Sequence, residues 1–186
     1  MKALLFLFLT LMGSVAIAET VSVRMDTSMG VMELSLDAEK APVTVANFLR
    51  YAKEKRYDGT IFHRVIPNFM IQGGGFEPSM QERDSEDSIK NEAANGLKNM
   101  RGTIAMARTN APHSASNQFF INVKDNDFLN HQAPSGRGWG YCVFGKVTQG
   151  MDVMDKIQHV VTDRKSGHSD VPTTPVLINS VTVLTN

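Results

Sequence analysis

Most hydrophobic positions in this chain fall in short runs of strand length. Some of these runs also alternate with polar positions at the two-residue period of β-strands, weakly in Val21–Thr27 and more clearly in Val31–Leu36. Glycine, proline, asparagine and serine separate these runs, as is typical of turns and loops. We expect about eight strands, at Val21–Thr27, Val31–Leu36, Ile61–Ile66, Phe69–Gln72, Gly102–Arg108, Asn117–Val123, Tyr141–Val147 and Val176–Leu184. So many strands, with no repeat and no linker, predict a mainly β fold in the form of a sandwich or a closed barrel.

Two segments have the periodicity of helices instead. Val43–Arg56 follows Pro42 and carries its apolar and charged residues on different faces, which predicts an amphipathic helix. Asp152–His159 predicts a second, shorter helix, and Asp125–Leu129 predicts a helical turn.

Three polar segments are expected to be loops. Gly75–Lys98 is rich in charge, and we expect it to be long and solvated. Its acidic residues lack the alternate-position spacing of a calcium-binding loop, so we reject a calcium site there. A loop of this length in a compact domain often borders a functional site. Thr162–Thr174 and His131–Gly140 are also expected to be loops, and the second holds the only tryptophan.

Residues 1–18 are typical of a secretory signal peptide. Met1–Lys2 is basic, Leu4–Leu9 is apolar, and Ala16–Ala18 has the small-x-small pattern of a cleavage site. An uncleaved anchor is the alternative, but the apolar segment is shorter than the roughly 20 residues of a membrane-spanning helix. We therefore expect residues 19–186 to form one exported domain with no stable membrane insertion after cleavage.

Composition narrows the choice of partners. The chain has 19 basic and 19 acidic residues, and removal of Lys2 with the signal peptide would leave the charge close to balance. That balance argues against a nucleic-acid surface or a strongly acidic partner. A single cysteine cannot form an internal disulfide, and Cys142 lies in an apolar run. We expect it to be a buried structural thiol.

The residue types present exclude several kinds of active site. There is no G-x-S-x-G motif, so a hydrolase of that kind has no support. The five histidines lack the spacing of metal ligands, and one cysteine cannot complete a zinc site. Gly136, Gly138 and Gly140 precede a strand instead of joining a strand to a helix, so a dinucleotide site is not indicated. We expect no metal and no cofactor.

An arginine among apolar residues marks the stretch Phe62–Gly75. Arg64 lies in the first of two short strands, a Pro-Asn turn follows, and three glycines end the stretch. Alternation along the second strand would turn Phe69 to the opposite face from Met70 and Gln72. A guanidinium among aromatic, thioether and amide side chains suits an extended peptide better than a phosphate or a metal.

One reaction needs only these groups, namely rotation about an X–Pro peptide bond. Its barrier of ~18–20 kcal/mol is the amide resonance that is lost as the nitrogen leaves the plane. In the twisted state that nitrogen becomes a hydrogen-bond acceptor, so a fixed guanidinium would bind the transition state better than the substrate. Arg64 is charged at any physiological pH, so this effect should not titrate.

Several blocks of the sequence resemble the cyclophilins, a family of peptidyl-prolyl cis-trans isomerases. With the N-terminal segment, the chain is most similar to the periplasmic cyclophilin A type of Gram-negative bacteria. The resemblance implies a closed eight-stranded antiparallel β-barrel capped by two α-helices. It extends from about Val21 to Leu184, nearly the whole of residues 19–186. The blocks that carry it are Phe62–Gly75, Gly102–Arg108, Ser116–Asn122, Phe128–Leu129 and Val143–Val147.

The resemblance also implies a role for each site residue. Arg64 would be the catalytic donor, Gln72 would orient it, and His63 would support its placement. Phe69 belongs to the same catalytic group and would line the proline pocket. The residues implied to bind substrate are Met70, Ala107, Arg108, Gln118, Phe120, Phe128, Leu129 and Tyr141.

The residues alone leave two alternatives open. Phe69 and Phe120 could be core aromatics, the commoner fate of such side chains, and Phe119 competes with Phe120 for the pocket. Arg64 could be the partner of a structural ion pair.

Three positions depart from the commoner pattern of the resembling family. Phe128 and Tyr141 stand where many members have tryptophan and histidine, which implies weak cyclosporin binding and retained isomerase activity. Arg108 replaces an asparagine, so its side chain would alter which residue is preferred before proline.

We therefore expect an enzyme of the periplasm that acts, as a monomer, on X–Pro bonds in unfolded or partly folded exported proteins. The alternative is a chaperone module that binds proline-containing segments and turns them over only incidentally.

Overall fold

The computed structural model describes residues 20–184, and the predicted signal peptide lies outside them. The elements are named β for strands, α for α-helices and η for short 3-10 helices. In chain order they are β1 (Thr20–Thr27), β2 (Gly30–Asp37), α1 (Pro42–Lys53), β3 (Thr60–Ile66), β4 (Met70–Gly73), η1 (Ala93–Asn95), β5 (Thr103–Met106), β6 (Phe119–Asn122), η2 (Asp127–Leu129), η3 (Gly136–Trp139), β7 (Val143–Gln149), α2 (Met151–Gln158), β8 (Thr162–Lys165), β9 (His168–Pro172) and β10 (Leu177–Leu184).

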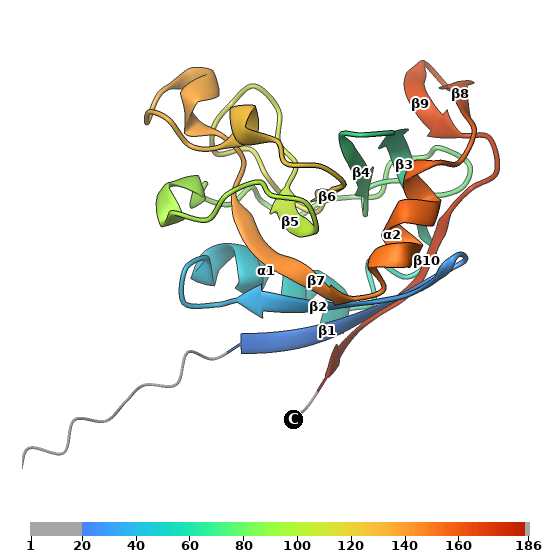
Figure 1. Ribbon diagram of the computed structural model, residues 1–186, viewed down its shortest axis with the longest axis horizontal. Coiled ribbons are helices and arrows are strands. Elements are labelled where there is room, and N and C mark those ends of the chain that lie inside the picture. Colours follow the sequence, from blue (N-terminus) through green and yellow to red (C-terminus); the bar gives the residue numbers. More distant parts are fainter. Residues whose placement is uncertain (1–19, 185–186) are drawn as a thin grey trace, which may run out of the picture.

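Eight of these strands close into an antiparallel barrel in the order β1-β10-β3-β4-β6-β5-β7-β2 (Figure 1). Closure pairs each barrel strand with a neighbour on both sides and so leaves no free sheet edge. The predicted eight-stranded antiparallel barrel with two α-helices is confirmed.

The remaining two strands correct the prediction for Thr162–Thr174, which is not a loop. It forms the β8–β9 hairpin, whose turn contains Ser166 and Gly167 at positive φ. Most of its side chains are exposed, while Val171 is buried against Ile61 of β3. A solvated two-stranded ribbon needs few apolar residues, so its sequence lacks the alternation that identifies a strand.

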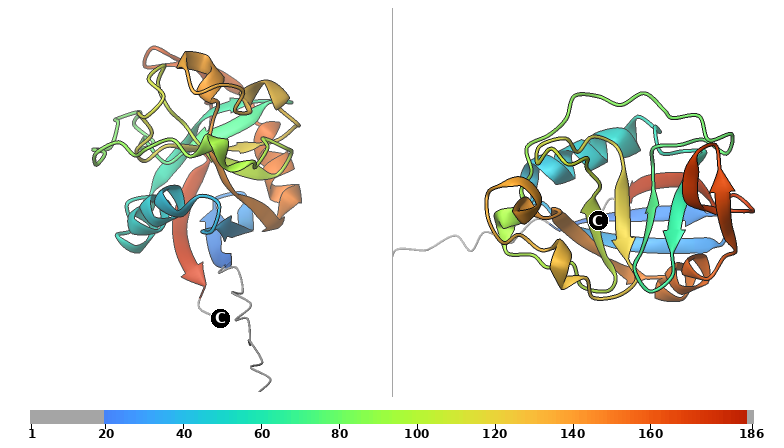
Figure 2. Two further views of the ribbon diagram at one scale, coloured as in Figure 1. Left: turned by 90° about the vertical axis from the view of Figure 1, so that its left-hand side faces the viewer. Right: turned by 90° about the horizontal axis from the view of Figure 1, so that it is seen from above.

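The two helices lie on different sides of the barrel, and both contribute side chains to its core (Figures 1 and 2). α1 begins at Pro42, where a missing N–H costs nothing. The backbone N–H groups of Val43 and Thr44 donate to the carboxylate of Glu92, at 3.2 and 2.8 Å. This contact caps the helix and places a negative charge at its N-terminus.

Glu92 belongs to the segment between β4 and β5, which the sequence predicts to be a solvated loop. Most of its side chains are exposed, as predicted. The segment is nevertheless tied down by the Glu92 contact, by pairing of Phe76 with Glu82, and by burial of Met80 against Phe76. These anchors depend on tertiary contacts that a polar composition does not reveal.

An aromatic cluster fills the core between α1 and the barrel. The fully buried ring of Phe48 lies 5.0 Å from Tyr57, 5.6 Å from Phe119 and 5.3 Å from Phe144, measured between ring centroids. Phe119 therefore faces inward, and its neighbour Phe120 faces the outer surface of β6. The alternative in which Phe119 takes the outward position is excluded.

A β-bulge in β3 decides which way Arg64 points. Phe62 pairs with Gly73 and Arg64 pairs with Gln72, so β3 has one residue more than β4 at this place. Phe62 and Val65 both enter the core, although strict alternation would put Phe62 and Arg64 on one face. The extra residue is His63, and it turns Arg64 to the outside of the barrel.

We expect the variant Phe48→Ala to lose about 3–5 kcal/mol of unfolding free energy, because a fully buried ring is replaced by a cavity. Urea unfolding followed by circular dichroism measures this change. Val161→Ala, at a side chain that is 73% exposed, is the matched control and should stay within about 0.5 kcal/mol of the wild type. Equal losses in the two variants would contradict the description of this core.

Candidate active site

Four strands bring one row of outward-facing residues together. Arg64 of β3 pairs with Gln72 of β4, Gln72 pairs with Phe120 of β6, and Phe120 pairs with Ala105 of β5. Side chains that are directly opposite across a sheet lie on the same face and within contact distance. The register therefore places a cation, an amide and an aromatic ring in sequence on one outer face of the barrel.

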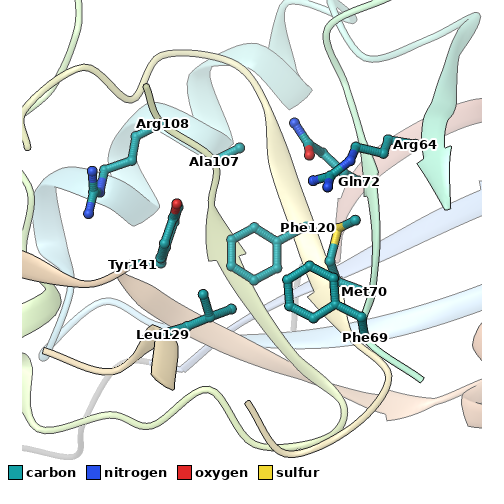
Figure 3. Close-up of a pocket in the computed structure, with 9 residues that line it drawn as sticks. All are labelled: Arg64, Phe69, Met70, Gln72, Ala107, Arg108, Phe120, Leu129 and Tyr141. Carbon is teal, nitrogen blue, oxygen red and sulfur yellow. The ribbon is translucent and has the colours of Figure 1, made fainter. Parts of the chain in front are cut away.

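A cavity of about 110 Å³ opens over this row (Figure 3). This volume suits one small side chain and is well below that of a drug-sized ligand site. The residues that line the cavity are Arg64, Phe69, Met70, Gln72, Ala107, Arg108, Phe120, Leu129 and Tyr141.

The floor of the cavity is apolar. Met70, Phe120 and Leu129 are 2%, 4% and 8% exposed and pack with Ala105 and Val143 in a cluster separate from the main core. A floor of this kind favours an apolar ring that leaves water, at roughly 25 cal/mol for each Å² buried.

The position of Phe69 differs from the one that strand alternation predicts. The sequence pattern puts Phe69 on the face opposite Met70 and Gln72, yet all three line the cavity. β4 begins at Met70, so Phe69 belongs to the preceding turn and does not follow the alternation. In that turn Asn68 has a φ of 57°, and the Phe69 N–H donates to the Ile66 carbonyl at 3.2 Å.

Arg64 lies at the edge of the cavity with 43% of its side chain exposed. Its Nε atom is 3.9 Å from Oδ2 of Asp170 on β9, a separation longer than a hydrogen bond. The Asp170 side chain is itself 41% exposed, so solvent screens the pair. The guanidinium is thus neither sealed in the interior nor turned away from the cavity.

Arg108 and Tyr141 form the opposite wall of the cavity. The Arg108 guanidinium lies over the Tyr141 ring at 4.6 Å, and its Nε donates to the Gly140 carbonyl at 2.9 Å. The Tyr141 N–H donates to the Leu129 carbonyl at 2.9 Å. The Arg108 side chain is held by stacking and by a hydrogen bond within the protein, and these contacts fix the wall of the cavity.

Three residues predicted for the site lie outside this cavity. Gln118 lines an adjoining polar cavity of about 210 Å³, which shares Gln72 with the first one. Phe128 is 67% exposed at the rim, and its ring stacks on Phe69 at 5.7 Å. His63 is buried at 4% exposure against Phe76, with ring centroids 4.5 Å apart, and does not line the cavity.

A network of asparagines under the site is absent from the sequence-based predictions. Asn126 donates from Nδ2 to the Phe69 carbonyl at 2.9 Å and to Oδ1 of Asn122 at 2.8 Å. Asn122 donates to Oδ1 of Asn99 at 3.1 Å, and the Asn99 N–H donates to Oδ1 of Asn130 at 2.7 Å. These amides connect the turn before β4 to η2, which carries Leu129. The sequence indicates this network only through the high number of asparagines near these elements.

Neither a metal nor an activated thiol is indicated near the cavity. Within residues 20–184 no three histidine, cysteine, aspartate or glutamate side chains lie close enough together to hold a metal ion. Cys142 is 3% exposed, and burial raises the pKa of its thiol to about 11. The burial of Cys142 agrees with the buried structural thiol that the sequence predicts.

Known proteins with the same fold and sequence pattern are isomerases. The family model described as cyclophilin type peptidyl-prolyl cis-trans isomerase/CLD matches residues 22–183. Peptidyl-prolyl cis-trans isomerase B of Escherichia coli K12 is 60% identical over 84% of this chain and 96% of its own length. Peptidyl-prolyl cis-trans isomerase A of Dickeya dadantii is 51% identical over 92% of this chain and 90% of its own length.

A solved structure supports the same assignment. A cyclophilin type isomerase of Cryptosporidium parvum, crystallised in the presence of the dipeptide Ala-Pro, has a TM-score of 0.76 and 27% identity. The match covers 89% of this chain and 99% of that one. The family match and the similar structure thus place the chain in a class of proteins that catalyse proline isomerisation. This chain belongs to the cyclophilin family and is a peptidyl-prolyl cis-trans isomerase.

Burial of His63 makes stability depend on pH. Burial, followed by the nearby His168 and Arg64, lowers the pKa of His63 from 6.5 to about 4. Between these two values the unfolded chain binds a proton that the folded chain does not bind. Above about pH 6.5 His63 is neutral in both states and has no effect on the free energy of unfolding. As the pH drops from 6.5 toward 4, protonation of His63 in the unfolded chain lowers this free energy by up to about 3 kcal/mol.

We expect the variant His63→Leu to lose less unfolding free energy than the wild type between pH 7 and pH 4, because it has no buried imidazole to protonate. Urea unfolding at both pH values gives the two differences. If wild type and variant lose the same amount, the burial of a neutral His63 is not the cause of acid sensitivity.

Proposed function

We propose that Arg64 catalyses the isomerisation by donating a hydrogen bond to the proline nitrogen as the X–Pro bond twists. The planar imide nitrogen is a poor acceptor and the twisted nitrogen is a good one, so this contact exists mainly in the transition state. The proline ring lies on the floor formed by Met70, Phe120 and Leu129, and the carbonyl side of the bond rotates above it.

The observation that carries this proposal is the position of Arg64. Its guanidinium lines the cavity, is partly exposed, and has Asp170 near Nε, which leaves the terminal nitrogens for substrate. Apart from Tyr141, the other residues that line the cavity include no nucleophile and no general base of the usual types. Because arginine stays protonated, the rate should not follow the titration of an active-site base.

We further propose that the enzyme acts in the periplasm on exported proteins that are unfolded or partly folded. The signal-peptide pattern of residues 1–18 supports this location. In the part of the chain that the structure describes, no helix is both long and apolar enough to cross a membrane. An open, partly exposed pocket suits extended segments of many sequences, because one proline ring is the main group that it holds.

The variant Arg64→Ala should lower kcat/KM by roughly 10²–10³-fold, the effect of removing one donor to a developing acceptor. A protease-coupled assay with a short X–Pro peptide measures the rate, and NMR titration measures peptide binding. Arg64→Lys should recover only part of the loss, since an ammonium lacks the planar fork of donors.

Arg101→Ala is the matched control, because Arg101 pairs with Asp155 at 2.7 Å and does not line the cavity. It should keep the wild-type rate. An unchanged rate in Arg64→Ala would contradict the mechanism. Binding without any catalysed isomerisation in the wild type would favour a chaperone that holds proline segments.

Expression of the full chain in a Gram-negative host should yield a periplasmic protein that begins at Glu19. Mass spectrometry of the periplasmic fraction measures the mature N-terminus. Ala16→Arg and Ala18→Arg together should block cleavage, since the site requires small residues at these positions. A protein that keeps residues 1–18 and stays in the cytoplasm would contradict the proposed location.

A further inference from the structure

Three polar side chains form a line that ends beside Arg64. Gln72 donates from Nε2 to Oε1 of Gln118 at 2.9 Å, and Gln118 donates from Nε2 to Oε1 of Glu82 at 3.4 Å. They come from β4, from the residue before β6, and from the segment that follows β4. Arg64 is the cross-strand neighbour of Gln72, and in Figure 3 it lies on the oxygen side of the Gln72 amide.

We propose that Glu82 is a positioning residue that fixes the orientation of both amides and, through them, the surroundings of Arg64. A carboxylate only accepts hydrogen bonds, whereas an amide can present either its oxygen or its nitrogen. Gln118 must therefore turn Nε2 toward Glu82 and Oε1 toward Gln72. Gln72 must then use Nε2 for Gln118, which leaves its Oε1 toward Arg64.

The reverse orientation would oppose the arginine. A guanidinium has five N–H donors and no acceptor. If Gln72 turned its NH₂ group toward Arg64, donors would face donors and the guanidinium would move away. With the oxygen on that side, the Gln72 amide attracts the guanidinium and helps to keep it at the edge of the cavity.

The backbone keeps the members of the line in place. Phe76 pairs with Glu82, and the Arg83 N–H donates to the Gly75 carbonyl at 2.9 Å, so the segment returns alongside the end of β4. Gln118 packs directly on Gly75, where an added Cβ would lie 2.5 Å from its Cγ. Gly75, the third glycine of the run Gly73–Gly75, thus makes room for the central amide of the line.

This inference rests on the proposed role of Arg64, and the experiment separates the two. The variant Glu82→Gln keeps the shape of the side chain but can also donate, so the two amides are no longer held in one orientation. We expect kcat to fall roughly three- to tenfold, the effect of one lost hydrogen bond, with KM unchanged. The side-chain amide NMR signals of Gln72 and Gln118 should shift in the same variant.

Asp84→Asn is the matched control, because it removes an exposed charge two residues away on the same segment, outside the line. It should keep the wild-type kcat. The same assay is repeated with peptides that carry lysine, alanine or glutamate two residues before proline. This comparison tests whether Glu82 recognises the substrate directly. If Glu82→Gln changes only KM, and mainly for the lysine peptide, Glu82 binds substrate charge and the positioning role is wrong.

A double variant tests whether Glu82 acts through Gln72. In the variant Gln72→Ala, the added substitution Glu82→Gln should not lower kcat further, because the line is already broken. An equal loss in both backgrounds would overturn the inference. If Arg64→Ala is slow while Glu82→Gln matches the wild type, the line has no positioning role and the proposed function stands. If Arg64→Ala matches the wild type, the proposed function itself fails.

Discussion

The active site depends on one extra residue in β3. Without the bulge at His63, alternation would direct Arg64 into the barrel beside Phe62, where a charge without a partner is very costly. With the bulge, Phe62 and Val65 still fill the core and Arg64 faces outward. The cost is a buried imidazole whose Nδ1 has no hydrogen-bond partner among the described residues. The bulge thus lowers stability at low pH and at the same time places Arg64 at the outer cavity.

The barrel brings together residues that the chain keeps far apart. Inward residues Val65, Ile71 and Ile121 pair across adjacent strands and form a rigid core under the site. The neighbouring outward row carries Arg64, Gln72 and Phe120. Because each register is fixed by burial on the inner face, the outer row cannot slip by one residue without exposing the core.

Much of this arrangement could be predicted from the sequence, and what could not has a physical reason. Strands with alternating residues were placed within a few positions, and nine of the predicted site residues meet in one cavity. The bulge at His63 and the β8–β9 hairpin carry no local signal, since both arise from contacts between distant segments. The same holds for Asn126, whose role is to hold the Phe69 carbonyl and thus the wall of the pocket.

A donor that acts only in the transition state must be fixed without being neutralised. A buried, hydrogen-bonded carboxylate would hold Arg64 firmly but would also occupy its donors and reduce its positive potential. Asp170 at 3.9 Å in a half-exposed pair gives a weaker and more screened field. In the proposed arrangement, a neutral amide from Gln72 would orient the guanidinium without cancelling its charge. Neutral dipoles near the terminal nitrogens and a distant charge near Nε are therefore the combination that the proposed mechanism favours.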